Sequence, residues 1–241
     1  MSYNSRFDHN AGPLGTYAGP AAEIDLGLRQ HMMRVYNFMA ACLAVTGIVA
    51  YAAIATGLYQ QIVGTPLIWL VMLAPLGAVL FLNFRIERLS VGAAQAIFWG
   101  FAAVMGLSLA AIFLIYTGAS IARVFFITAG TFAATSVYGY MTQRDLSRFG
   151  SFLFMGLIGI ILAAVVNIFI GSSALQFAIS VIGVIVFTGL TAWDTQRIKQ
   201  IYLHSDPGDA LTKKALMGAL SLYLNFINLF LMLLRLVGQR R

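Results

Sequence analysis

Long apolar segments recur along this chain at the length that crosses a bilayer, and they fix the class of fold. A transmembrane helix needs about 20 consecutive, mostly apolar residues. Seven segments meet that requirement, at about Val35–Leu58, Pro66–Phe84, Ala93–Tyr116, Ile121–Met141, Gly150–Ile170, Ala174–Trp193 and Leu216–Val237. The sequence therefore predicts an all-α integral membrane protein, folded as a bundle of seven transmembrane helices.

The composition supports this class and excludes several others. Only 10% of the residues are charged, whereas soluble domains carry about 25%. A membrane β-barrel would instead show strict alternation of polar and apolar residues. Cys42 is the sole cysteine, which rules out a disulfide within the chain and a cysteine-based metal site. The net charge of +7 comes from basic residues scattered over short connections, so we expect the bilayer as partner and no nucleic acid.

The chain divides into two regions. Residues 1–28 are polar and rich in Gly, Pro, Ala and Tyr, without an apolar stretch of signal-peptide length. We expect them to form a disordered cytoplasmic tail. Residues 29–241 form the seven-helix transmembrane domain, and a basic collar from Arg29 to Arg34 precedes its first span.

The distribution of basic residues predicts the orientation. Cytoplasmic loops carry an excess of Lys and Arg, and with the N-terminus inside, 11 of the 15 basic residues fall on the inner side. The other four are Arg123, Arg235, Arg240 and Arg241. We therefore predict a multi-pass membrane protein with a cytoplasmic N-terminus. The outer position of Arg240 and Arg241 opposes the rule, and a re-entrant last segment would remove that conflict.

Asp194 is the acidic residue that most needs an explanation. It continues a long apolar segment with no Gly or Pro between them, and a carboxylate at the centre of a transmembrane helix costs about 2.5–3.5 kcal/mol. Three partners are open: Arg197 one turn later, the amide of Asn225, or an arginine after the second span. Of Arg85 and Arg88 we favour Arg85, because it follows that span directly. The alternative is a solvated aspartate at the membrane interface.

The final span carries a polar stripe. Its members recur every four and then three residues, so they share one helical face: Ser221, Asn225, Asn228, Met232 and Arg235. If the last two spans are antiparallel neighbours, the start of this stripe meets Asp194 in the cytoplasmic third of the bundle. The alternative is that these side chains serve as interhelical hydrogen-bonding groups.

No pattern of an intramembrane enzyme is present in the sequence. An aspartyl protease needs two intramembrane carboxylates, and Asp194 has no second. The three histidines are dispersed and no HExxH motif occurs. A retinal Schiff base needs a lysine in the last span, whereas all three lysines precede it. We expect no enzyme, no cofactor and no metal site beyond weak Ca²⁺ or H⁺ binding at Asp194.

Two segments resemble paired signatures of a known family. GLTAWDTQRIK (189–199) and LYLNFINLFLMLLRLVG (222–238) are similar to the C-terminal motifs of the Bax inhibitor-1-like (transmembrane Bax inhibitor motif) family, and GLSLAAIFLIYTGASI (106–121) also fits. The bacterial branch of that family includes YccA-type inner-membrane proteins. The resemblance implies a protein of a bacterial inner (plasma) membrane, folded as a seven-helix bundle with the last helix near the centre. It also implies a pH-sensitive calcium leak, protection from cell death, or, in bacteria, binding to an ATP-dependent membrane protease.

The resemblance also implies a site. Its leak depends on two aspartates that share protons and on an arginine at the end of the second helix. Asp194 matches the first aspartate, whereas Asn225 stands in place of the second. An Asp–Asn pair holds at most one negative charge and loses the coupled titration of two carboxylates. It is also a poor calcium cage, because calcium usually takes more than one carboxylate.

The sequence thus yields two functional hypotheses. The first is a pH-influenced ion (calcium) leak or stress and cell-death regulator, with Asp194, Asn225, Asn228, Arg85 and Arg88 as ion- or proton-sensing residues. The alternative is a non-conducting regulator that binds another membrane protein, such as an ATP-dependent membrane protease.

Overall fold

The computed structural model describes residues 20–241, and its side chains from Leu26 onward. This part of the chain is helical, with seven helices long and apolar enough to cross a membrane. The elements are α1 (Pro20–Ala55), α2 (Leu58–Val63), α3 (Leu67–Arg85), the 3-10 helix η1 (Ile86–Arg88), α4 (Val91–Leu109), α5 (Ile112–Ile115), α6 (Gly118–Met141), α7 (Ser147–Ile170), α8 (Ser173–Gln200) and α9 (Gly208–Val237). The predicted all-α bundle of seven transmembrane helices is confirmed.

Several helices extend beyond the apolar segments that predicted them. α1 already begins at Pro20, inside the segment predicted as a tail, and residues 1–19 of that segment lie outside the described residues. α8 continues past Asp194 to Gln200, and α9 begins at Gly208. The length of an apolar segment indicates only the part of a helix that lies in the hydrocarbon core. Polar turns at the helix ends are therefore not predicted from it.

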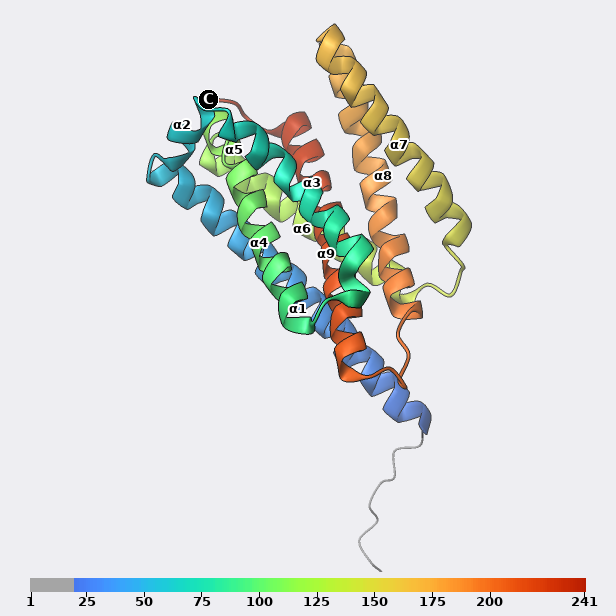
Figure 1. The fold of residues 1–241 in the computed structure, drawn as a ribbon. Coiled ribbons are helices and arrows are strands. Elements are labelled where there is room, and N and C mark those ends of the chain that lie inside the picture. Colours follow the sequence, from blue (N-terminus) through green and yellow to red (C-terminus); the bar gives the residue numbers. More distant parts are fainter. Residues whose placement is uncertain (1–19) are drawn as a thin grey trace, which may run out of the picture.

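The last helix, α9, lies at the centre of the bundle. It packs against α8, α1, α6 and α4, which surround it in Figure 1. Tyr223 and Leu222 near its middle are fully buried. Tyr223 stacks edge-on against Phe101 of α4, with 5.3 Å between ring centroids, and its hydroxyl lies 2.8 Å from Thr46 Oγ1 of α1. The expectation that the last helix lies near the centre is therefore confirmed.

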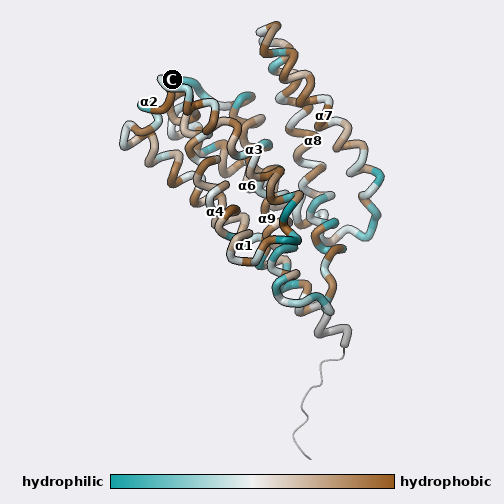
Figure 2. Tube along the Cα trace, in the orientation of Figure 1, coloured by the Kyte–Doolittle hydropathy of each residue, from teal (hydrophilic) through white to brown (hydrophobic). Residues whose placement is uncertain are grey.

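Helix α7 lies at the periphery and packs mainly on α8 (Figure 1). Its outer face carries large apolar side chains that are mostly exposed, such as Phe152 (68%) and Met155 (70%). The tube in Figure 2 shows the same hydrophobic character along the outer helices, with hydrophilic residues gathered at the helix ends. In a bundle of this hydropathy such a surface faces lipid rather than water.

Close approaches between helices rely on glycine. A Cβ at Gly106 of α4 would lie 2.6 Å from the carbonyl oxygen of Thr46 in α1. A Cβ at Gly139 of α6 would collide with the backbone of Ala192 in α8. Small residues at such points let helix backbones pack closely in membranes.

The C-terminal tail lies at the end of the bundle opposite to the start of α1 (Figure 1). α9 is continuous to Val237, and Arg240 then forms a β-bridge with Tyr116, just before α6. The backbone N–H of Thr117 also donates to the carbonyl of Gln239. The last segment is therefore not re-entrant, and the tail lies on the side of the α5–α6 connection.

Candidate functional site

Asp194 lies inside the bundle, on the face of α8 that meets α9. Asp194 is only 5% exposed, and Asn225 opposite it on α9 is 6% exposed. The alternative of a solvated interfacial aspartate therefore does not hold. α8 and α9 are antiparallel neighbours joined by a short connection.

One oxygen of the Asp194 carboxylate accepts two hydrogen bonds from α9. Ser221 Oγ donates to Asp194 Oδ2 at 2.8 Å, and Asn225 Nδ2 donates to the same oxygen at 2.7 Å. The two donors lie four residues apart and hence on one face of α9. A buried carboxylate without such donors would be strongly unfavourable, so α9 supplies the polar environment that α8 requires.

The other carboxylate oxygen faces a cation. Arg197 Nη1 lies 3.9 Å from Asp194 Oδ1, one turn further along α8. The arginine side chain is 54% exposed and also lies over the ring of Trp193, with its guanidinium carbon 5.3 Å from the centroid. At this separation and exposure the ion pair contributes at most about 1 kcal/mol. Oδ2 of Asp194 thus accepts two hydrogen bonds, whereas Oδ1 has only a weak ion pair with Arg197.

The remaining predicted site residues lie elsewhere. Arg85 and Arg88 are exposed at the end of α3 and in η1, and within the described residues neither forms an ion pair with Asp194. The preference for Arg85 as partner was therefore wrong, because the intrahelical Arg197 takes that position. Asn228 donates to the carbonyl of Leu224 in its own helix at 2.8 Å, and so bonds within α9 rather than with the carboxylate.

Ser221 and Arg197 lie next to Asp194 but are not among the five residues predicted from the sequence as ion- or proton-sensing. Ser221 belongs to the polar stripe of the final span. Its spacing of four residues from Asn225 is the signal that both face Asp194. Arg197 is one of the three alternative partners that the sequence offers for Asp194, and its spacing of three residues from Asp194 places both on one helical face. Sequence alone gave no reason to prefer it over an arginine from another helix.

Polar side chains near the C-terminal end of α8 bond to the neighbouring α6–α7 connection and to α6. Gln196 Nε2 donates to the carbonyl of Arg144 at 2.8 Å, and its Oε1 accepts from the N–H of Leu146 at 2.9 Å. Thr195 Oγ1 and Ser136 Oγ of α6 lie 3.1 Å apart. Residues 194–196 thus contact α9, α6 and the α6–α7 connection from one turn of α8.

The surroundings of Asp194 differ on its two sides along the helix axis. On one side, a cavity of about 120 Å³ is lined by Ser221 and Arg197, the neighbours of Asp194, together with Asn83 and mostly apolar side chains. In the direction of the C-terminal end of α9, apolar side chains fill the space between α8 and α9: Val186, Leu190, Leu229 and Met232. The cavity therefore lies on the side of Arg197 and Ser221, and an apolar core lies on the other side of Asp194.

The described residues contain no group of three or more His, Cys, Asp and Glu side chains that could hold a metal ion. The polar groups gathered at Asp194 are its own carboxylate, the hydroxyl of Ser221 and the amide of Asn225. Such a set can bind a proton or a weakly held cation, but it lacks the several carboxylates of a tight calcium site.

Comparisons with known proteins agree with the motif resemblance. Residues 28–241 match the family model described as "Inhibitor of apoptosis-promoting Bax1". The chain is 47% identical to Inner membrane protein YbhL of Escherichia coli over 219 residues, which are 89% of this chain and 94% of the relative. It is 48% identical to a protein of Rickettsia prowazekii over 218 residues (90% and 92%). It is 34% identical to a membrane protein of Streptococcus pyogenes over 218 residues (89% and 95%).

The named bacterial relative among these is YbhL rather than a YccA-type protein. Two findings show the family. The family model covers the whole transmembrane domain, and relatives above 30% identity match along almost their full length. The chain therefore belongs to the Bax inhibitor-1 family of multi-pass membrane proteins.

Proposed function

We propose that this protein is a non-enzymatic ion leak of a bacterial inner membrane, in which Asp194 binds the transported proton or cation. The location is that stated in the name of the relative YbhL. The observation that carries the proposal is a buried, ionisable carboxylate in a transmembrane helix, with one oxygen left free of hydrogen bonds from the described residues. Ionisable groups inside a membrane are costly and mark ion or proton pathways.

The geometry supports weak and reversible binding rather than a tight site. Asp194 Oδ1 faces Arg197 at 3.9 Å, and Arg197 and Ser221 line a cavity of about 120 Å³ next to the site. A conducting site must bind strongly enough to admit an ion and weakly enough to release it. The apolar core between α8 and α9 closes the other side, so conduction requires these two helices to separate at Leu190 and Leu229.

The test is flux into liposomes that contain the purified protein, measured for Ca²⁺ and for H⁺ across pH. We expect wild type to conduct slowly and Asp194→Asn to lose most of that flux, because the neutral amide cannot exchange a proton or bind a cation by charge. Asp145→Asn is the matched control, since Asp145 lies exposed in the α6–α7 connection. Liposomes that stay tight with folded wild type, or an Asp194→Asn protein that conducts like wild type, would refute the leak. Such a result would favour a regulator that acts by contact with another membrane protein.

A further inference from the structure

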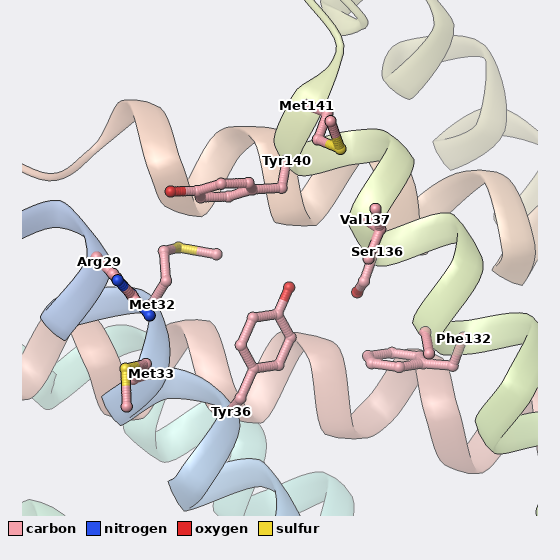
Figure 3. Close-up of a pocket in the computed structure, with 10 residues that line it drawn as sticks. Arg29, Met32, Met33, Tyr36, Phe132, Ser136, Val137, Tyr140 and Met141 are labelled. Carbon is pink, nitrogen blue, oxygen red and sulfur yellow. The ribbon is translucent and has the colours of Figure 1, made fainter. Parts of the chain in front are cut away.

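A second and larger cavity lies apart from Asp194, between α1 and α6. Its volume is about 720 Å³, within the range of about 300–1,000 Å³ typical of ligand pockets. α1 and α6 both pack against α9, and Figure 3 shows side chains from the two helices facing each other across the space between them. Met33, Val137 and Met141 on its walls are 55%, 55% and 71% exposed, so the pocket opens toward lipid.

The depth of this pocket matches one leaflet. Its lining on α6 runs from Phe132 to Met141, the last residue of the helix. At 1.5 Å per residue this stretch covers about 13 Å, and half of a hydrocarbon core is about 15 Å. Met32 and Phe132 on its walls are buried. The pocket is therefore an apolar trough that begins at the membrane surface and runs inward along the acyl chains.

The end of the trough near the membrane surface is basic. Arg29 lines it and is exposed, and none of the ten lining residues is acidic. Lys199 Nζ lies 5.2 Å from the ring centroid of Tyr140 and donates to the carbonyl of that residue. The side chains of Tyr36 and Tyr140 reach into the space between the helices (Figure 3). Among the described residues neither hydroxyl has a hydrogen-bond partner, so both can donate to a ligand oxygen.

We propose that this pocket binds one anionic phospholipid from the leaflet at the basic end of the bundle, with an acyl chain in the trough and the phosphate at Arg29. Basic residues at the membrane surface attract anionic lipids, and arginine suits phosphate because its guanidinium can donate two hydrogen bonds. A second copy of this chain is a poor occupant, because a symmetric contact would bring the same basic, acid-free face against itself. Ser136 on the wall bonds to Thr195 beside Asp194, so the lipid would sit next to the α6–α8 contact. The proposal does not depend on the ion leak.

The experiment uses phosphatidylglycerol that carries a photoactivatable diazirine on one acyl chain, in vesicles that contain the full-length protein. Mass spectrometry of the cross-linked peptides compares two equally exposed methionines, Met141 in the pocket (71%) and Met155 on α7 (70%). We expect labelling of Met141 to exceed that of Met155 several-fold. The same probe with a phosphatidylcholine headgroup should label the two methionines to within about twofold of each other, because it offers no net negative charge to Arg29.

Variants separate a specific site from general lipid contact. Arg29→Gln should reduce the preference for phosphatidylglycerol to the level of phosphatidylcholine. Ala133→Trp fills the pocket and should abolish the excess labelling, whereas Ala134→Trp, at an equally exposed alanine that does not line the pocket, should leave it unchanged. Equal labelling of Met141 and Met155 by the anionic probe, or equal effects of the two tryptophans, would overturn the proposal. If the excess labelling of Met141 disappears as the amount of protein per lipid is raised, a second copy of the chain occupies the pocket instead.

Discussion

Asn225 stands where the family resemblance implies a second aspartate, and this one residue sets how many charges the site can hold. Its amide nitrogen lies 2.7 Å from Asp194 Oδ2. A carboxylate there would face another at hydrogen-bond distance, and two such groups share a proton and titrate as a pair. With an amide, the site holds one negative charge at most, balanced by Arg197 alone among the described cations within ion-pair distance.

Substitution of Asn225 should therefore restore a coupled titration. We expect any flux of wild type to depend weakly on pH, and Asn225→Asp to add a second titration step and make the flux steeper with pH. The measurement is liposome flux at several pH values. Asn228→Asp is the matched control, because Asn228 lies on the same helix but bonds to its own backbone. If wild type responds as steeply as Asn225→Asp, the pH response does not reside in this pair.

A second residue-scale prediction concerns the buried hydroxyl of Tyr223. It lies 2.8 Å from Thr46 Oγ1, which also donates to the carbonyl of Ala102 at 3.1 Å. Tyr223→Phe keeps the ring but removes this link between α9 and α1. Interhelical hydrogen bonds in membranes contribute about 0.6 kcal/mol on average and up to about 1.7 kcal/mol, so we expect a loss in that range. Unfolding in mixed detergent micelles measures it against Tyr138→Phe, a change on a 53% exposed residue; equal losses would contradict the assigned bond.

At the scale of helices, the contact between α6 and α8 depends on Gly139. A Cβ there would collide with the backbone at Ala192, two residues before Asp194, and backbone cannot move aside as a flexible side chain can. We expect Gly139→Ala to destabilise the protein by about 1–3 kcal/mol, the usual cost of overpacking. Gly130→Ala in the same helix meets nothing within 4 Å and should be neutral or slightly stabilising, because alanine favours helix over glycine. A Gly139→Ala protein as stable as Gly130→Ala would mean that the two helices lie further apart.

Element-scale features were the most predictable part of this molecule. Apolar length located all seven spans, and the four-residue spacing of Ser221 and Asn225 placed them on one face opposite Asp194. The sequence could not choose among partners from different helices, because the pairing of Asp194 with Arg197 rather than Arg85 depends on where α3 packs. The lipid-facing trough was also beyond prediction, since the residues that form it on α1 and α6 are ordinary apolar side chains distant in sequence.

At the scale of the whole molecule, the structure shows which connections lie on the same side of the membrane. The distribution of basic residues predicts which of the two sides is cytoplasmic. The structure places Arg240 beside Tyr116, so the C-terminus and the α5–α6 connection share one side. The α8–α9 connection lies at the other end of the bundle (Figure 1). The excess of Lys and Arg, 11 of 15, predicts that this second end faces the cytoplasm. The first statement concerns which segments share a side of the membrane, and the second concerns which side is the cytoplasm.

Cysteine labelling tests both claims at once. Cys42 is buried, so Cys42→Ala provides a background without cysteine, into which Gly118→Cys, Ser205→Cys or Arg241→Cys is introduced at an exposed position. A membrane-impermeant maleimide applied to intact spheroplasts should label positions 118 and 241, and should label position 205 only after the membrane is permeabilised. Labelling of 118 and 241 from different sides would contradict the tail contact at Tyr116. Labelling of 205 alone from outside would keep the fold and invert the orientation, because the relative sides would be right and the positive-inside assignment wrong.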